Sequence, residues 1–135
     1  MPFCDITVVP VPTDKKREYL QFTKRMAEVY RECGASRITD YWHDADASHA
    51  ADFHAENAMD TYDASRLPDF RKLAGALDGQ TVVVSITEWP SRELRDLGVK
   101  AVASDPRILA TTDEDPIFDG RDLIAGGFTV EFDTT

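Results

Sequence analysis

Apolar residues along the chain recur with two different periods, and these periods predict an alternating order of strands and helices. Residues 3–11 alternate as a β-strand, and residues 80–89 form the clearest strand of the sequence. Between the first strand and Gly34, apolar residues recur every three or four positions, which is typical of an amphipathic helix with one buried face. These positions are Tyr19, Phe22, Met26, Val29, Tyr30 and Cys33.

The residues that flank this first helix predict where it begins and ends. Pro10 and Pro12 should end the preceding strand, because proline has no backbone N–H to donate to a neighbouring strand. Thr13 or Asp14 supplies a side-chain oxygen for the helix N-terminus. Gly34 can adopt the left-handed conformation that commonly ends a helix.

Four further elements follow. A second strand is expected over 35–43, a short helical turn over 65–77, a second long helix over 91–104 and a last strand over 121–132. Ser91 should cap the second long helix, and Asp105-Pro106 should end it. Apolar residues should mark the buried sides of the turn (Leu67, Phe70, Leu73 and Leu77) and of the helix (Leu94, Leu97, Ala101 and Val102).

This order of elements predicts an α+β protein with a ferredoxin-like βαββαβ sandwich. Right-handed crossovers of two strand–helix units give one antiparallel sheet with helices on one face. We expect a single domain, 1–135, with an insertion at about 44–66 between the second strand and the short helical turn. Gly126 and Gly127 in the last strand predict a bulge or a close approach to the backbone.

The alternation of the strands predicts which side chains face the helices and which face away. We expect the more apolar set, which includes Cys4, Ile6, Val82 and Val84, to face the helices. The opposite face would then need a cover, and a second copy stacked sheet on sheet would supply one. Polar members of that face would line a pocket for a small organic molecule, formed by Asp5, Thr7, Tyr41, Ser85, Thr87 and Trp89.

Within that expected pocket, Asp5 or Glu88 is the candidate for acid–base catalysis, since desolvation would raise the pKa of a carboxyl group there. The alternative is that these polar groups only satisfy one another at a dimer interface. The sequence contains no nucleophile elbow, phosphate-binding loop, dinucleotide fingerprint or C-x-x-C pair. We therefore expect no bound cofactor, and the sequence leaves open whether the protein is an enzyme.

All three histidines of the chain, His43, His49 and His54, lie within 12 residues and alternate with acidic residues. Imidazole and carboxylate groups together could hold zinc, nickel, copper or manganese. Their separations of six and five residues do not match the i, i+4 spacing of helical zinc sites, so a metal would require a folded loop. An ordinary acidic surface insertion is the alternative.

Composition and charge remove several classes of partner. Acidic residues outnumber Lys and Arg by 25 to 15, and the resulting net charge of −10 would repel nucleic acids and anionic membranes. The apolar runs are too short to span a bilayer, and the N-terminus lacks the pattern of a signal peptide. We expect a cytoplasmic protein in which Cys4 and Cys33 remain free thiols.

Four stretches of the sequence resemble a known bacterial family. They are residues 5–12 (DITVVPVP), 88–96 (EWPSRELRD), 104–107 (SDPR) and 118–128 (FDGRDLIAGGF). They identify the chain as similar to domain of unknown function 1428, the YbaA-like proteins, from Phe3 to about Phe132. The resemblance implies a dimeric α+β barrel and supplies no substrate, cofactor or catalytic residue. The segment 44–66 looks longer than its counterpart in that family.

Three hypotheses about function follow. A homodimer could bind or transform a small organic molecule between its sheet faces, which predicts a pocket around Asp5, Thr7 and Ser85. A metal-binding protein would bring the imidazoles within mutual reach. A structural or interaction dimer without catalysis would instead expose a large apolar patch elsewhere on its surface.

Overall fold

The computed structural model describes residues 1–47 and 49–134; Ser48, inside the expected insertion, and Thr135, at the end of the expected domain, lie outside the described residues. The strands of the described chain form one antiparallel sheet in the order β2-β3-β1-β4. Their bounds are Phe3–Pro12 for β1, Arg37–Trp42 for β2, Gln80–Trp89 for β3 and Ile124–Thr129 for β4. The expected α+β class and antiparallel sheet are confirmed.

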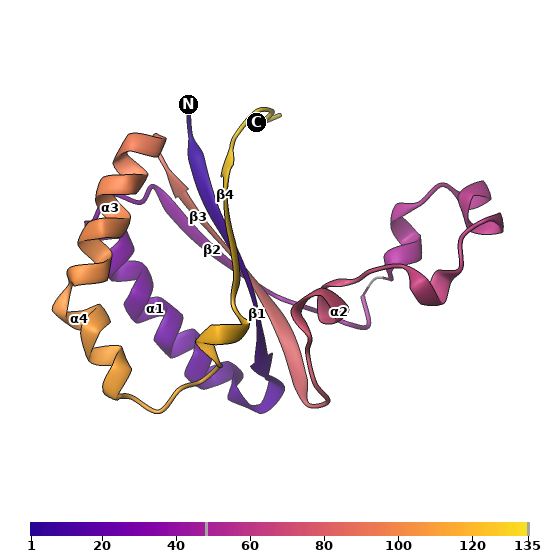
Figure 1. Ribbon diagram of the computed structural model, residues 1–135, viewed down its shortest axis with the longest axis horizontal. Helices are drawn as coiled ribbons and strands as arrows, with labels where there is room; N and C mark the ends of the chain where they lie inside the picture. The colour runs from indigo at the N-terminus through magenta and orange to yellow at the C-terminus, as the bar shows by residue number, and fades with distance from the viewer. Residues whose placement is uncertain (48, 135) are drawn as a thin grey trace.

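Two long helices, α1 (Lys16–Glu32) and α3 (Arg92–Ser104), lie on one side of the sheet, with the short α4 (Pro106–Leu109) after α3 (Figure 1). The expectation that all helices share one face is wrong for α2 (Phe70–Ala74). Ala74 packs against Val8 and Val82 on the opposite face. The remaining helical turns are 3-10 turns at Thr13–Lys15, Ala50–Phe53, Glu56–Asp60, Ala64–Arg66, Ala110–Asp113 and Gly120–Asp122.

The ends of the first strand and helix differ in part from expectation. β1 continues through Pro10, which pairs with Val82 of β3. β1 pairs with β4 only as far as Val8, so one edge of β1 is free at Pro10. Proline is tolerated on a free edge, because no neighbouring strand needs its missing N–H. Neither Thr13 nor Asp14 caps α1, and the Thr13 hydroxyl donates to the Gly79 carbonyl instead, at 3.0 Å. Gly34 has the expected positive φ, 111°.

The register of the sheet reverses the expected assignment of its two faces. Val9 and Val83 are cross-strand partners, and both pack in a buried cluster with Tyr19 of α1. The set that includes Asp5, Thr7 and Ser85 shares that side of the sheet, so it faces the helices. The set that includes Cys4, Ile6 and Ile86 faces away from α1 and α3. Alternation alone could not decide between the faces, because both sets mix apolar and polar residues.

Trp89 anchors the helix layer at the end of β3. Its side chain is 1% exposed, and its ring lies 6.3 Å from that of Tyr30 on α1. Gly98 of α3 makes room for this ring, since a methyl group there would come within 2.7 Å of the Trp89 Cη2 atom and of the Cys33 carbonyl oxygen. A bulky side chain at position 98 would therefore separate α3 from the sheet.

The buried face of α3 is rotated from the expected one. Gly98 and Val102 are the buried residues of this helix, whereas Leu94 and Leu97 are exposed, Leu97 by 67%. The expectation that Leu94, Leu97 and Ala101 form the buried stripe is wrong. The reason is that the glycine, which carries no hydropathy signal, provides the contact surface for Trp89. The expected cap is confirmed, with Ser91 accepting from the Leu94 N–H at 3.1 Å.

We expect Gly98→Ala to lower the free energy of unfolding by about 1–3 kcal/mol, because overpacking against Trp89 outweighs the better helix propensity of alanine. Gly120→Ala is the control, since nothing lies within 4 Å of a methyl group placed there. Urea unfolding of both variants measures the effect. Equal stability of Gly98→Ala and the parent protein would show that α3 does not rest on the Trp89 ring.

Candidate functional site

Asp5, the first candidate for catalysis, is held by two partners on the helix side of the sheet. Arg95 of α3 donates from Nε to both carboxylate oxygens, at 3.1 and 3.0 Å, and the Trp89 indole N–H donates at 3.1 Å. The hydrogen bond to Asp5 raises the pKa of the Arg95 guanidinium. Both carboxylate oxygens are therefore engaged by the chain itself, as expected of a structural ion pair.

Asp40 of β2 forms a second carboxylate centre that the sequence did not reveal. Tyr19 and Thr23 of α1 donate to its Oδ2 atom at 2.8 and 2.6 Å. Ser85 of β3 donates to the other oxygen. Burial, followed by the Asp40 charge, raises the pKa of the Tyr19 hydroxyl above its ordinary range. The Asp40 centre thus joins α1, β2 and β3 through one carboxylate.

The position of Asp40 on β2 could have been found from the alternation of that strand. Ile38, Asp40 and Trp42 share one side of β2 and pair with Thr87, Ser85 and Val83 of β3. A carboxylate between two apolar residues on a buried side usually has hydrogen-bonding partners. The partners themselves could not be named from sequence, because Tyr19 and Thr23 belong to a helix whose rotation over the sheet is set by packing.

Two of the other expected pocket residues also face the helix layer, whereas Tyr41 does not. Thr7 pairs with Ser85 and Thr87 pairs with Asp5, so both threonines share the side of the two carboxylates. Tyr41 pairs with Val84 and lies on the opposite face, 52% exposed. The six residues therefore do not line one pocket between two sheet faces. The structure brings five of them to the helix side.

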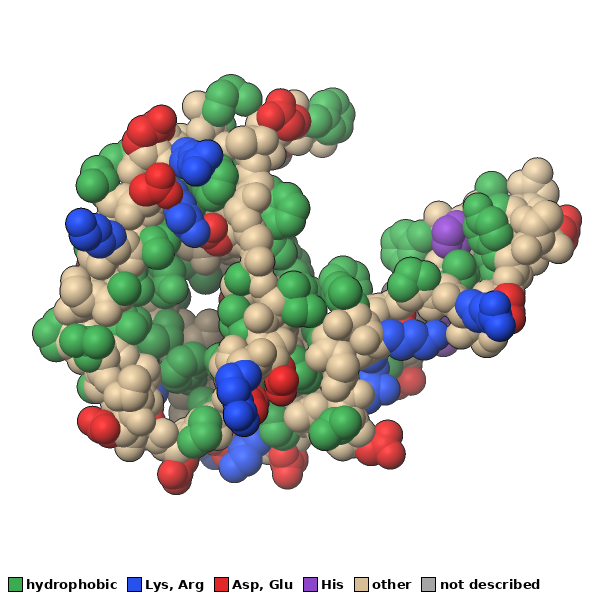
Figure 2. All heavy atoms as spheres, in the orientation of Figure 1, with side chains coloured by type: hydrophobic (Ala, Val, Ile, Leu, Met, Phe, Trp, Pro, Cys, Tyr) green, Lys and Arg blue, Asp and Glu red, His purple; other side chains and the backbone are tan. Residues whose placement is uncertain are grey.

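The helix layer leaves an opening beside β4, visible between the helices and that strand (Figure 2). Ala125 and Gly127 of β4 point to this side by register and are exposed. Phe3 lies over Gly127, where an added methyl group would meet its Cζ atom at 2.6 Å, and Arg95 lies 5.8 Å from the Phe3 ring centre. The close approach expected at the glycine pair is thus an internal packing contact.

Glu88, the second candidate for catalysis, lies on the face away from α1 and α3. Its register partner on β1 is Cys4, and its carboxylate is 3.9 Å from Arg37 of β2. Burial raises the pKa of the Cys4 thiol, and the charges of Glu88 and Asp5 raise it further. The thiol therefore stays protonated, which argues against a nucleophilic cysteine. Both cysteines are free, as expected.

The sheet surface turned away from α1 and α3, which we call the open face, is largely apolar. By register it carries side chains from all four strands, and α2 covers only the end around Val8 and Val82. Phe128 and Ile124 at its β4 edge are 51% and 41% exposed. Its members by register are Arg37, Thr39, Tyr41, Gln80, Val82, Val84, Ile86, Glu88, Cys4, Ile6, Val8, Pro10, Pro12, Ile124, Gly126 and Phe128.

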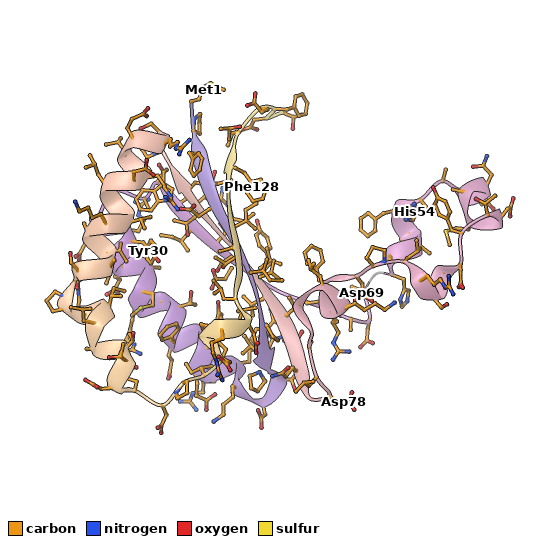
Figure 3. All side chains as sticks on the ribbon, in the orientation of Figure 1. Met1, Tyr30, His54, Asp69, Asp78 and Phe128 are labelled. Carbon is orange, nitrogen blue, oxygen red and sulfur yellow. The ribbon has the colours of Figure 1, made fainter. Side chains whose placement is uncertain are left out.

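His43 lies where the chain leaves β2, and His49 and His54 lie on the arm, which we define as residues 44–47 and 49–66. The arm projects from the body beyond α2 (Figure 1), and Figure 3 shows His54 on the arm and Asp69 at the start of α2. His43, His49 and His54 line one cavity between the arm and α2. The sequence thus identified three residues that do come together in space.

No cluster of three or more His, Cys, Asp or Glu side chains among residues 1–47 and 49–134 is arranged to hold a metal ion. The His54 ring packs edge-on against Tyr62, with ring centres 5.2 Å apart, and Asp69 caps α2 by accepting from the Lys72 N–H at 2.8 Å. The metal hypothesis requires the imidazoles to lie close enough together to bind one ion. The described residues do not show that arrangement.

We expect Tyr19→Phe to remove part of the loss of stability at alkaline pH. The folded-state pKa of Tyr19 is raised, so its contribution is complete below the unfolded pKa of about 10 and is lost as pH rises above that value. The stability advantage of the parent protein over Tyr19→Phe should shrink by about 1 kcal/mol between about pH 9 and about pH 11. Urea unfolding across this range, with the half-exposed Tyr41→Phe as control, measures it. If the stability difference between the parent protein and Tyr19→Phe stays constant over this pH range, the pKa of Tyr19 is not raised in the folded state.

We expect Asp5→Asn to lower the free energy of unfolding by about 1–2 kcal/mol, because the amide can still accept from Trp89 but loses the charge that binds Arg95. Asp96→Asn is the matched control. Asp96 supplies the other carboxylate bound to Arg95, and the Asp96 side chain is more exposed than that of Asp5. Its substitution should lower the free energy of unfolding by under about 0.5 kcal/mol. Thermal unfolding compares them. Equal, small effects would mean that Asp5 is not a structural carboxylate.

The stretches that carried the family resemblance hold the fold together. Phe118 packs against Tyr19 and Phe22 of α1, with ring centres 6.2 and 6.0 Å apart. Asp105 caps α4, and its hydrogen bonds with Arg107 lower its pKa to about 2. Arg107 also reaches Glu32 of α1 at 2.6 Å. These motifs therefore fix helix positions.

Comparisons with known proteins match the chain over most of its length. The family model described as "Protein of unknown function (DUF1428)" matches residues 2–120. "Uncharacterized protein YbaA" of Escherichia coli K12 is 35% identical over 128 residues, covering 95% of each chain, and the Shigella flexneri protein of the same name matches equally.

A solved structure, "Structure of Rv0793 from Mycobacterium tuberculosis", aligns over the full length of both chains, with 12% identity and a TM-score of 0.48. That likeness is too loose to carry an argument. The family match and the YbaA identity confirm the resemblance, and the chain belongs to the DUF1428 family of proteins of unknown function.

Proposed function

We propose that the protein acts as a homodimer in which the open faces of two ferredoxin-like sheets stack, giving a dimeric α+β barrel in the cytoplasm. The observation that carries this proposal is the exposed apolar surface of the open face. Proteins rarely leave such a surface in water, and antiparallel sheets commonly bury it against a second sheet. The homodimer hypothesis of the sequence analysis likewise covers an apolar sheet face with a second copy.

The chemistry of the open face suits a second copy of the same chain. Its centre is formed by Ile6, Val84 and Ile86, which are half-buried within one copy. Phe128 and Tyr41 stand at opposite edges of the face, on β4 and β2, and aromatic side chains are enriched at interfaces. A two-fold axis that lies between the stacked faces and runs parallel to the strands would place the edge of one copy against the opposite edge of the other.

The charges of the open face are also self-complementary. Arg37 and Glu88 are its charged members, they carry opposite signs, and their groups lie 3.9 Å apart near one end of β2 and β3. Like charges therefore do not need to meet when two identical faces stack. The net charge of −10 per chain resides elsewhere and opposes association only through long-range repulsion, which salt screens.

A small-molecule site between the two sheets needs residues other than those expected. Asp5, Thr7 and Ser85 face the helices, and both carboxylate centres on that side are satisfied within the chain. Tyr41 is the expected pocket residue that the open face retains. The geometry therefore supports assembly better than catalysis at Asp5 or Glu88, and we assign no reaction.

We expect the protein to sediment as a dimer and Phe128→Glu to weaken dimerisation by about 100-fold or more. The substitution places two charges in an apolar interface, one from each copy, and buried aromatic anchors carry about 2 kcal/mol or more each. Phe128 lies exposed on the edge strand β4, so the fold should tolerate the change. Sedimentation equilibrium gives the dissociation constant.

Leu97→Glu is the matched control for this experiment, because Leu97 is exposed on α3, on the other side of the sheet. It should leave the dimer intact. A monomeric parent protein would overturn the proposal. A dimer lost in Leu97→Glu but kept in Phe128→Glu would move the interface to the helix side and overturn it as well.

A further inference from the structure

The middle of the sheet beneath α1 and α3 is polar and half-buried, although both ends of the same surface are apolar and buried. Trp89 is buried at one end, and Val9 and Val83 are buried at the other. Between these ends lie two pairs of polar residues, Asp5 with Thr87 and Thr7 with Ser85, all half-buried. The side of a sheet that packs against helices normally carries the apolar core. The helices therefore leave a hollow over the middle of the sheet.

This hollow opens beside β4, where Figure 2 shows the opening between that strand and the helices. On this side β4 carries only small residues, Ala125 and Gly127, and both are exposed. Trp89 and Val83 are six positions apart on β3, which corresponds to about 20 Å at about 3.3 Å per residue. The length between the two buried ends admits a small organic molecule.

Three hydroxyl groups around the hollow have no partner. Thr7 and Thr87 face the helix side by register, and their hydroxyls make no hydrogen bond within the described chain. The same holds for the hydroxyl of Tyr30, which is half-buried on α1. Burial raises the pKa of Tyr30, the charge of Asp5 raises it further and the charge of Arg95 lowers it, so this hydroxyl lies within reach of that ion pair. These three groups are free to bind a molecule in the hollow.

The charged groups around the hollow favour an uncharged ligand. The carboxylates of Asp5 and Asp40 lie on this side of the sheet, and both are already held by donors of the chain. An anion would be repelled by these carboxylates and by the net charge of −10. A cation would have to displace Arg95 from Asp5, or the α1 hydroxyls from Asp40. An uncharged molecule meets neither cost.

The free groups are donors, which favours a ligand that carries hydrogen-bond acceptors. Tyr30 keeps its proton at neutral pH because its pKa is raised above its ordinary value, and threonine hydroxyls can donate as well. A carbonyl oxygen accepts such bonds and carries no charge. The Phe3 ring lies over Gly127 at the opening and offers an apolar wall to a planar molecule.

We propose that the hollow beneath α1 and α3 binds a small, planar, uncharged carbonyl compound, with its oxygen accepting from the hydroxyls of Thr7, Thr87 and Tyr30. These residues belong to one chain and lie on the side of the sheet opposite the open face. The inference therefore goes beyond the proposed homodimer and does not depend on it.

Three probes with the same ring and different charges test the proposal by isothermal titration calorimetry at neutral pH. Benzamide is uncharged and presents a carbonyl oxygen, benzoate is an anion and benzamidine is a cation. We expect benzamide to bind at least about tenfold more tightly than either charged probe, because each charged probe meets one of the electrostatic costs described above. The proposal is overturned if benzamide does not bind or if a charged probe binds as tightly.

Substitutions that remove single hydroxyls locate the site. Thr7→Val, Thr87→Val and Tyr30→Phe should each weaken benzamide binding about fivefold, which is the effect of one lost hydrogen bond. None of them should lower the free energy of unfolding, because these hydroxyls have no partner in the chain. Thr39→Val is the control, since Thr39 is half-buried on the open face and should not affect binding. Parent-like binding by all three variants would rule out this site.

Two further variants close the opening and separate this proposal from the dimer. Ala125→Trp fills the opening and should weaken benzamide binding at least about tenfold, whereas Ala101→Trp on the exposed side of α3 should not. Both alanines are exposed, so both variants should fold. Phe128→Glu should bind benzamide as the parent protein does, even as a monomer. Loss of binding in Phe128→Glu, or normal binding in Ala125→Trp, would overturn the inference.

Discussion

The need to satisfy two carboxylates beneath the helices governs how the layers of this protein come together. Asp5 and Asp40 lie on the same side of the sheet, and their partners come from α3, from α1 and from the neighbouring strand. A charge in this position is tolerated only with hydrogen-bond donors around it. Each carboxylate therefore fixes one helix against the sheet, Asp5 through Arg95 and Asp40 through Tyr19.

This arrangement uses the polar residues that would otherwise be candidates for chemistry. Arg95 and Trp89 donate hydrogen bonds to the Asp5 carboxylate, which gives Asp5 a structural role. Asp40 has a structural role for the same reason, since Thr23 of α1 donates to it. The set that includes Cys4, Ile6 and Ile86 is turned to the other side, where α2 covers only one end. The apolar face suited to a second copy lies there, and the hollow with the free hydroxyls lies beneath the helices.

Small residues permit this packing where large ones would prevent it. Gly98 admits the Trp89 ring beneath α3, and Gly127 admits the Phe3 ring beside Asp5. Phe118, in the stretch most characteristic of the family, joins the aromatic cluster of α1. The stretches that carried the family resemblance are thus explained by packing, and the arm carries exposed aromatic side chains, Phe53 and Tyr62.

The sequence alone determined the elements, their order and the family, because hydrophobic period, caps and glycine positions are local properties. It also brought attention to His43, His49 and His54, which do meet at one cavity. The tertiary structure decided which face of the sheet the helices cover, since alternation defines two faces and does not orient them. It also decided the Asp40 centre and the fit of Trp89 on Gly98, because these contacts join segments far apart in the chain.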